Sequence, residues 1–174
     1  MQPGIILQTD RLRLRRFTTG DAAFIVALLN SPGWLRFIGD RGVHNEADAL
    51  RYLGNGPFKS YAERGFGLSL VETKEGTAAG MCGILVRDTM DYPDIGFAFL
   101  PEHAGKGYGY EIASTTLRHA RSAWGLTTID AITLPDNTAS IRLLERLRMH
   151  RIGTSTSPAG EELLLYRSSH TIES

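Results

Sequence analysis

The chain has 174 residues, of which 42% are hydrophobic and 22% charged, and its 19 Lys and Arg balance its 19 Asp and Glu. These values exclude a wholly disordered chain and argue against a generic nucleic-acid or anionic-membrane binder. The length predicts a single domain over residues 1–174. No apolar run approaches the ~20 residues of a membrane span, no signal-peptide core is visible, and the single Cys82 allows no internal disulfide, so we expect a cytoplasmic protein.

The first part of the chain predicts one strand and two short helices. Residues 11–17 alternate as a strand whose basic side chains face solvent. Capping-box spacing at Thr18–Asp21 and again at Asn45–Asp48 predicts a helix after each. Gly54-Asn55-Gly56-Pro57 is expected to end the second helix, and residues 34–42 are expected to form an aromatic, charged loop between the two.

The remainder of the chain predicts five further strands and two helices. Residues 66–72, 80–87 and 94–100 are separated by short turn-rich segments, which is typical of an antiparallel meander. A helical stripe that runs from Ala113 to Trp124 ends at Gly125, and residues 128–134 form a strand. Asn137 then begins a helix, and residues 163–166 form the last strand. The order β-α-α-β-β-β-α-β-α-β predicts an α/β (α+β) fold with a mixed, mostly antiparallel sheet flanked by helices.

Residues 104–111, Ala-Gly-Lys-Gly-Tyr-Gly-Tyr-Glu, are the most informative segment. They follow a strand and open a helix, so glycines expose backbone amides where the helix dipole also favours an anion. The turn predicts a site for a phosphorylated cofactor. A dinucleotide fold fits poorly, because Tyr110 occupies the third glycine position, and a P-loop lacks its Ser or Thr. A dinucleotide oxidoreductase is therefore a third-ranked alternative.

Three motifs in this order resemble the GNAT superfamily of acetyl-CoA-dependent N-acetyltransferases, in the branch of ribosomal-protein N-terminal acetyltransferases. Gly107-Tyr108-Gly109 matches the glycines of the central motif Gln/Arg-x-x-Gly-x-Gly/Ala, with Ala104 at its first position. Residues 137–147 are similar to the helix motif Asn-x-x-Ser-x-x-Leu-Leu-Glu-x-Leu, and residues 7–15 are similar to the first strand. The resemblance covers roughly residues 5–167; Met149-His150 departs from the usual Gly-Phe.

The resemblance implies where acetyl-CoA binds. The strand 94–100 would splay from the strand 128–134, and pantetheine would pair with free backbone groups of Phe99 and Leu100. Asn137 and Ser140 would contact the pantetheine arm. The pyrophosphate would rest on the backbone amides of six consecutive residues, Gly105, Lys106, Gly107, Tyr108, Gly109 and Tyr110. The side chain of Lys106 would add positive charge.

The resemblance also implies direct attack of an amine on the thioester, with a backbone N–H near Phe99 stabilising the oxyanion. Asp94 is the first candidate for the general base, and its alternative is a cap at the start of the strand. Glu102 and His103 could act through water. Many members of the superfamily carry a tyrosine acid where this chain has Leu144, so Ser140 or Tyr166 are the candidates to protonate the thiolate.

The acceptor would contact the variable segments, where Trp34, Phe37, Asp40 and Arg41 are the candidates. The two aromatic residues could instead pack the helices onto the sheet, and the charged ones could be solvated. A protein N-terminal amine is the leading acceptor, followed by a small-molecule amine; a catalytically silent acyl-CoA-binding module is a further alternative. Cys82 is expected in the core, and no metal, nucleic-acid or membrane site is expected. The chain is expected to be a monomer or a homodimer.

Overall fold

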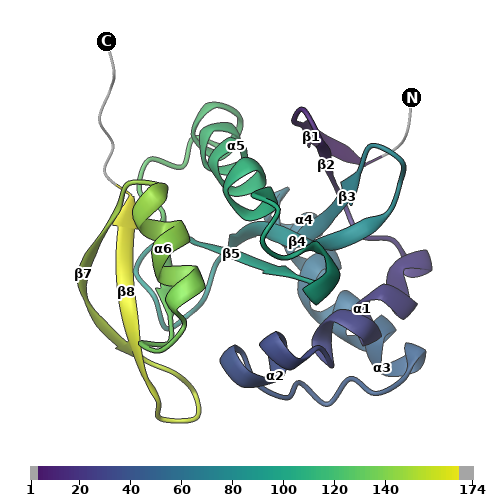
Figure 1. Cartoon of the computed structure of the whole chain (residues 1–174), viewed down its shortest axis with the longest axis horizontal. Helices are drawn as coiled ribbons and strands as arrows, with labels where there is room; N and C mark the ends of the chain where they lie inside the picture. The colour runs from purple at the N-terminus through teal and green to yellow at the C-terminus, as the bar shows by residue number, and fades with distance from the viewer. Residues whose placement is uncertain (1–3, 169–174) are drawn as a thin grey trace.

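The computed structural model describes residues 4–168, which form one eight-stranded sheet with helices on both faces (Figure 1). The strand order is β1-β2-β3-β4-β5-β6-β8-β7, and every neighbouring pair is antiparallel except β5 and β6. This confirms the predicted fold class. The elements are β1 (Ile5–Gln8), β2 (Leu12–Arg15), α1 (Ala22–Leu29), α2 (Pro32–Phe37), α3 (Glu46–Leu53), α4 (Lys59–Arg64), β3 (Ser69–Thr73), β4 (Ala78–Leu85), β5 (Asp94–Phe99), α5 (Tyr108–Trp124), β6 (Asp130–Thr133), α6 (Thr138–Arg146), β7 (Met149–Thr156) and β8 (Glu162–Ser168).

The two faces of the sheet carry separate cores, because successive residues of a strand point to opposite sides. On one face, Val71 and Cys82 pack in a cluster with residues of α5 and α6. On the other face, their neighbours Leu70 and Met81 pack with residues of α1 and α3. In Figure 1, α5 and α6 accordingly lie apart from the α1–α3 group. Each side chain of β5 and β6 therefore belongs to one of two environments.

The predicted helix boundaries at polar caps are confirmed. The hydroxyl of Thr18 accepts a hydrogen bond from Gly20 N at 3.2 Å, and the carboxylate of Asp21 accepts one from Thr18 N at 2.8 Å. Asn45 Oδ1 accepts one from Asp48 N at 2.8 Å. Gly125 ends α5 with φ of +66°, a left-handed conformation that glycine adopts at little cost.

Two strands are additional to the predicted order. The opening strand is a hairpin of β1 and β2, with its turn at Thr9–Arg11. The first half of the segment 153–160, expected to be a variable loop, belongs to β7, an edge strand whose one partner among the described strands is β8. Apart from Met149, the side chains of β7 are exposed or half-buried, so the strand lacks the alternating apolar pattern by which strands are recognised.

Two helical segments also differ from the prediction. The expected loop 34–42 contains α2, a helix of six residues with Pro32 in its first turn, which is too short to show a periodic pattern. Gly54-Asn55-Gly56-Pro57 does not end α3; the chain continues as a π-helical turn, Gly54–Phe58, and then α4. A wider π turn accommodates Pro57, whose ring would clash with the preceding turn of a regular α-helix.

The basic face of β2 is paired rather than solvated. Arg15 Nη2 lies 2.9 Å from Asp21 Oδ1, and Arg15 Nε lies 3.2 Å from Glu72 Oε2. Arg13 Nε approaches the other oxygen of Glu72 at 3.3 Å. Among residues 4–168, no helix is long and apolar enough to cross a membrane.

Candidate active site

The glycine turn forms an anion cradle at the start of α5. Gly105 and Gly107 have φ of +74° and +81°, and Gly107 is the N-cap of the helix. Within residues 4–168, no backbone carbonyl or side chain accepts a hydrogen bond from the amides of Gly105 to Tyr110; the first amide of α5 that is bonded is that of Glu111, to Gly107 O at 3.2 Å. These unpaired donors, with the positive end of the helix dipole, fit a pyrophosphate.

The split in the sheet lies directly before this cradle. β5 and β6 are joined by a single residue pair, Asp94 with Asp130, and diverge beyond it. Asp130 N donates to Pro93 O at 2.8 Å, so the odd-numbered residues of β5 direct their backbone groups towards β6. Past the divergence, the N–H and C=O groups of Phe97 and Phe99 therefore face the split, where an extended chain can pair with them.

Leu100 departs from the expected pattern. Its N–H donates to Ala79 O at 3.0 Å, and its C=O accepts from His103 N at 3.0 Å. Both groups are thus used within the chain, because alternate residues of β5 point to β4. Phe97 replaces Leu100 as the second residue with backbone groups directed into the split.

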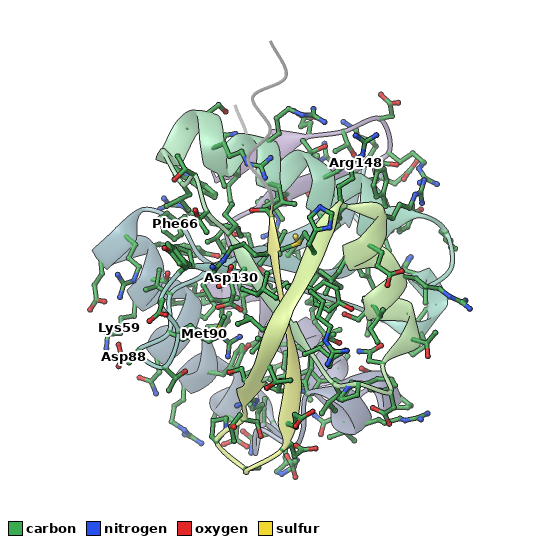
Figure 2. The ribbon with its side chains drawn as sticks, turned by 90° about the vertical axis from the view of Figure 1, so that its left-hand side faces the viewer. Lys59, Phe66, Asp88, Met90, Asp130 and Arg148 are labelled. Atoms are coloured by element: carbon green, nitrogen blue, oxygen red, sulfur yellow. The ribbon has the colours of Figure 1, made fainter. Side chains whose placement is uncertain are left out.

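Two buried ion pairs close the narrow end of the split. Asp94 is 1% exposed and its two oxygens lie 3.0 and 3.2 Å from Arg87 Nε; Asp130 Oδ1 lies 2.7 Å from Arg167 Nε. Viewed from the β7–β8 side, Asp130 lies near the middle of the molecule (Figure 2). Burial raises the pKa of Asp94, and the neighbouring Asp130 adds to this, against the opposing effect of Arg87. A raised pKa suits a general base, but the carboxylate is inaccessible and bonded, so this role stays a prediction.

The start of α6 borders the other side of the split. Asn137 caps the helix by accepting a hydrogen bond from Ser140 N at 3.2 Å. Ser140 lies one turn before the fully buried Leu144, on the same face of the helix. On the adjacent face, Leu143 packs so closely to α5 that a Cβ on Gly109 would lie 3.1 Å from it. Ser140 is therefore on the side of α6 that faces α5 and the split.

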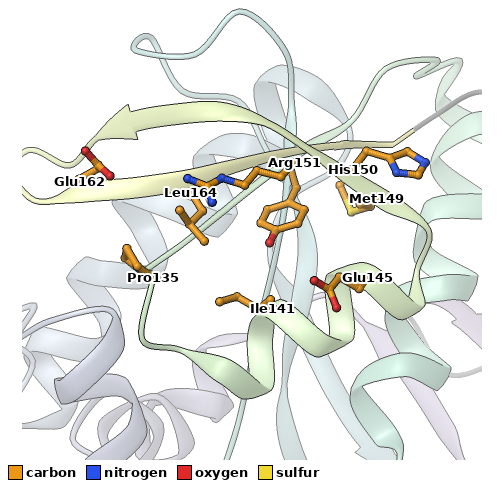
Figure 3. A pocket seen from close by; sticks show the side chains of 9 residues that line it. Pro135, Ile141, Glu145, Met149, His150, Arg151, Glu162 and Leu164 are labelled. Carbon is orange, nitrogen blue, oxygen red and sulfur yellow. The ribbon is translucent and has the colours of Figure 1, made fainter.

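Tyr166 lies in a different place. It is 4% exposed, pairs with Ala131 across β6 and β8, and lines a recess of about 610 Å³ between α6 and the β7–β8 hairpin. Ile141 and Glu145 of α6 face Leu164 and Arg151 of the hairpin across this recess (Figure 3). Tyr166 is thus separated from the split by β6, whereas Ser140 borders it.

The four candidate acceptor residues divide into core and surface. Trp34 is 6% exposed and packs with the α1–α3 core, and its Nε1 has no hydrogen-bond partner among the described residues. Phe37 is half-buried beneath the guanidinium of Arg36, 4.8 Å from its ring centre. Asp40 and Arg41 are exposed, and Asp40 accepts a hydrogen bond from Gly42 N at 2.8 Å.

The end of α2 lies beside the start of α6, where the two elements flank the split. Arg36 Nη2 approaches Asp136 Oδ2 at 3.9 Å, and both side chains are exposed. Such a pair contributes little energy, but it shows that residues a hundred positions apart lie next to each other. α2 therefore lies next to the segment that leads into α6.

Arg11 is a site residue that sequence reasoning missed. Its Nε donates to Glu111 Oε1 at 2.7 Å, its Nη1 donates to Lys106 O at 2.9 Å, and its guanidinium lies 4.8 Å from the ring centre of Tyr108. Thr9 Oγ1 and Arg11 N both donate to Glu111 Oε2, at 2.5 and 3.1 Å. We call Thr9, Arg11 and Glu111 the latch, because they hold the β1–β2 turn against the glycine turn.

The other polar candidates are placed as follows. Glu102 is exposed; the half-buried His103 stacks on Tyr108 with ring centres 6.2 Å apart, and its Nδ1 has no partner among residues 4–168. Cys82 lies in the core as predicted, and burial raises the pKa of its thiol to about 12. Within the described part of the chain, no three or more His, Cys, Asp or Glu side chains group as metal ligands would.

Comparison with known sequences agrees with this geometry. The model of the acetyltransferase (GNAT) domain family matches residues 11–150. YoaA of Bacillus subtilis (strain 168), described as an uncharacterised N-acetyltransferase, is 30% identical over 151 residues, which are 85% of this chain and 84% of that protein. YkkB of the same organism is 29% identical over 150 residues, with 83% and 84% covered.

Solved structures share the fold at low identity. An acetyltransferase from Agrobacterium tumefaciens has a TM-score of 0.81 at 22% identity, covering 98% of this chain and 96% of that one. RimL, a ribosomal L7/L12 alpha-N-protein acetyltransferase in complex with coenzyme A, has a TM-score of 0.80 at 15% identity, covering 94% and 97%. Spermidine N-acetyltransferase from Vibrio cholerae has 0.76 at 16%, covering 92% and 96%. With the family model matched over most of its length, the chain belongs to the GNAT acetyltransferase family and is an N-acetyltransferase.

Proposed function

We propose that this chain transfers the acetyl group of acetyl-CoA to the α-amine of a peptide or protein N-terminus. Acetyl-CoA is the donor that GNAT acetyltransferases use, and the residues present fit it on two counts. The amides of Gly105 to Tyr110 are unpaired donors for the pyrophosphate, and the backbone of Phe97 and Phe99 is free to pair with the pantetheine. The exposed Lys106 adds charge at the turn, and Asn137 and Ser140 border the arm.

When bound, acetyl-CoA supplies an acetyl group activated as a thioester. The backbone N–H groups of Phe97 and Phe99 are the donors directed into the split, so they are the proposed stabilisers of negative charge that develops on the reacting carbonyl oxygen. In other enzymes, removing one such donor raises the activation barrier by about 3–4 kcal/mol. Holding the amine and the thioester next to each other in the split lowers the activation barrier further through proximity.

The acceptor is inferred from the ion pairs at the narrow end of the split. Asp94 and Asp130 are the carboxylates there, and each is already bonded to an arginine. A polyamine needs uncompensated carboxylates, and a lysine amine, with a pKa of about 10.4, needs a strong base. An α-amine, with a pKa of about 7.7–8.0, is partly neutral at physiological pH and needs neither. The saturation of these two carboxylates is the observation that carries the choice.

For the leaving thiolate, we propose Ser140 as the nearest hydroxyl and Tyr166 as the alternative. Ser140 lies on the side of α6 that faces the split, whereas Tyr166 lies beyond β6 in another recess. On the acceptor side, Phe37, Asp40 and Arg41 are proposed to contact the peptide. Trp34 supports α2 from within the core rather than contacting substrate.

A single matched experiment tests the acceptor class. Thiol release from acetyl-CoA is measured with a lysine-free peptide that has a free N-terminus, and with the same peptide blocked at its N-terminus and carrying one lysine. Spermidine and free amino acids complete the panel. We expect turnover with the first peptide alone. Turnover only with spermidine or an amino acid would establish a small-molecule acetyltransferase, and binding of acetyl-CoA without thiol release would favour the silent binder.

A further inference from the structure

The recess of about 610 Å³ between α6 and the β7–β8 hairpin is a second cavity, and we call it the hairpin recess. Ile141 and Glu145 line it from α6 (Figure 3). Leu143, which packs towards Gly109 of α5, lies about 200° around the helix from Ile141, so α6 separates the hairpin recess from the glycine turn. The volume is within the range of about 300–1,000 Å³ typical of small-ligand pockets.

The floor of the hairpin recess is apolar and includes one free hydroxyl. Met149 and Leu164 are buried side chains that line it from the hairpin, and Ile141 lines it from α6. Tyr166 is also buried and lines the recess, and its hydroxyl has no hydrogen-bond partner among residues 4–168. A tyrosine hydroxyl can both donate and accept, so it is available to a polar group of a ligand that enters the recess.

Two groups of opposite charge face each other across this floor without bonding (Figure 3). Arg151 is paired with Tyr166 in the register of β7 and β8, so both side chains are on the side of the sheet that faces α6. Glu145 projects from α6 on the other side of the recess. Neither Arg151 nor Glu145 has an ion-pair partner among residues 4–168. The recess therefore presents an available guanidinium and an available carboxylate on opposite sides of an apolar floor.

We propose that the hairpin recess binds a zwitterion with an apolar side chain, which a free amino acid or a short peptide would provide. Its carboxylate would bond Arg151 and the hydroxyl of Tyr166, because a guanidinium can bond a carboxylate through two parallel donors. Its ammonium group would bond Glu145, with Glu162, which also lines the recess, as a second carboxylate. Its apolar side chain would cover the floor and exclude water from it. A ligand with a single charge would leave one of the two opposed groups without a partner.

The test is equilibrium binding of leucine and of the dipeptide leucylleucine, measured by calorimetry on the intact chain without acetyl-CoA. Leucinamide lacks the carboxylate and N-acetylleucine lacks the ammonium group. We expect each to bind about tenfold more weakly than leucine, which corresponds to ~1.4 kcal/mol. Glycine, which has both charges but no apolar side chain, should also bind more weakly. The tighter of leucine and leucylleucine would show whether the ligand is a free amino acid or a peptide.

Two variants test the two charged groups separately. Arg151→Ala should weaken the binding of leucine about tenfold and leave that of leucinamide nearly unchanged. Glu145→Gln should weaken the binding of leucine and leave that of N-acetylleucine nearly unchanged. Both side chains are exposed, so we expect both variants to fold. Arg142→Ala is the matched control, because Arg142 is exposed on α6 but does not line the hairpin recess.

Three outcomes contradict the inference, and each leaves the proposed function intact. Binding of neither leucine nor leucylleucine would overturn it. Binding that survives in the double variant Glu145→Gln/Arg151→Ala would place the ligand elsewhere, such as at the acceptor side of the split, and would overturn the hairpin recess as its site. An equal loss of binding in Arg142→Ala would show that the effect is one of general surface charge.

Discussion

The two ends of β5 use polar groups in opposite ways. At the Phe99 end, β5 is not paired with β6, and the amides of Gly105 to Tyr110 in the following turn have no partner among the described residues. At the Asp94 end, two buried carboxylates sit side by side, and each is bonded to an arginine. The Phe99 end therefore has unpaired hydrogen-bond donors, whereas the charged groups at the Asp94 end are paired.

This difference shows where binding energy can come from. Unpaired backbone donors are costly inside a protein, so they persist where solvent or a ligand reaches them. A buried ion pair that is fully bonded offers nothing to a ligand, because its oxygens are already in use. The first arrangement indicates a binding site, and the second indicates an anchor that holds β5 and β6 together where the split begins.

The sharpest test of the binding end is Gly107→Asp. The variant places a carboxylate among the amides of the cradle and forces a residue with a Cβ to adopt φ of +81°. We expect the affinity for acetyl-CoA to fall by about 100-fold or more, or ~3 kcal/mol. Gly125→Asp is the matched control, because Gly125 has a similar φ of +66° at the other end of α5. An unchanged affinity in Gly107→Asp, or an equal loss in the control, would remove the cradle from this turn.

The anchoring end is tested by Asp94→Asn. A general base would be worth about 10²–10⁴-fold in turnover. Because Asp94 is buried and bonded to Arg87, we expect a smaller effect on turnover, within tenfold of wild type, and an unchanged affinity for acetyl-CoA. We also expect the free energy of unfolding to fall by about 2 kcal/mol, because the variant breaks a pair whose carboxylate is buried and whose arginine is partly exposed.

Thermal unfolding and the pH dependence of kcat distinguish the two roles of Asp94. Loss of the acidic limb of the pH profile, where kcat rises as the base deprotonates, together with a drop in kcat beyond 10²-fold would establish Asp94 as the base predicted from the sequence. Asp88→Asn, an exposed carboxylate one residue beyond Arg87, should change neither quantity.

Features encoded by local sequence could be predicted, and those that depend on distant contacts could not. Glycine spacing before a helical stripe located the cradle, and polar caps such as Thr18 and Asn45 located helix starts, because those interactions join residues a few positions apart. Alternation identified the meander for the same reason. By contrast, the polar edge strand β7 and the six-residue α2 carry too little periodicity to be recognised.

The missed site residue illustrates the same limit. Its alternating neighbours predict a place on a solvated basic strand, and nothing near Arg11 in sequence indicates its partner Glu111, which is a hundred residues away. Leu100 shows a second limit of prediction from sequence. The sequence places Leu100 at the end of a strand, but the register against β4 decides whether its backbone groups face the split or the neighbouring strand.

The latch is expected to strengthen the cradle without taking part in the reaction. Arg11→Ala should raise KM for acetyl-CoA about fivefold, ~1 kcal/mol, with kcat nearly unchanged, because it removes contacts to Glu111 and to Lys106 O. Arg16 offers a matched control: it lies 4.8 Å from the ring centre of Tyr61 and donates to Gly65 O at 3.1 Å, away from the cradle. A fall in kcat in Arg11→Ala, or an equal change in Arg16→Ala, would contradict a positioning role.

The smallest expected effect is the pH dependence of the latch. Burial alone would raise the pKa of Glu111, but hydrogen bonds from Thr9 and Arg11 outweigh it and lower the pKa below its usual value. A carboxyl with a lowered pKa in the folded state stabilises the fold above its unfolded pKa of about 4.3, and this contribution is lost as pH falls through the folded value.

The stability difference between wild type and Glu111→Gln should therefore shrink on acidification from pH 6 to 3, measured by urea unfolding. Because Glu111 is only partly buried and its partner Arg11 is exposed, added salt should reduce the difference. Glu63→Gln is the control, because Glu63 is an exposed glutamate on α4, and its stability difference should not change with pH. A stability difference for Glu111→Gln that grows on acidification would contradict the expected sign and exclude the latch as its source.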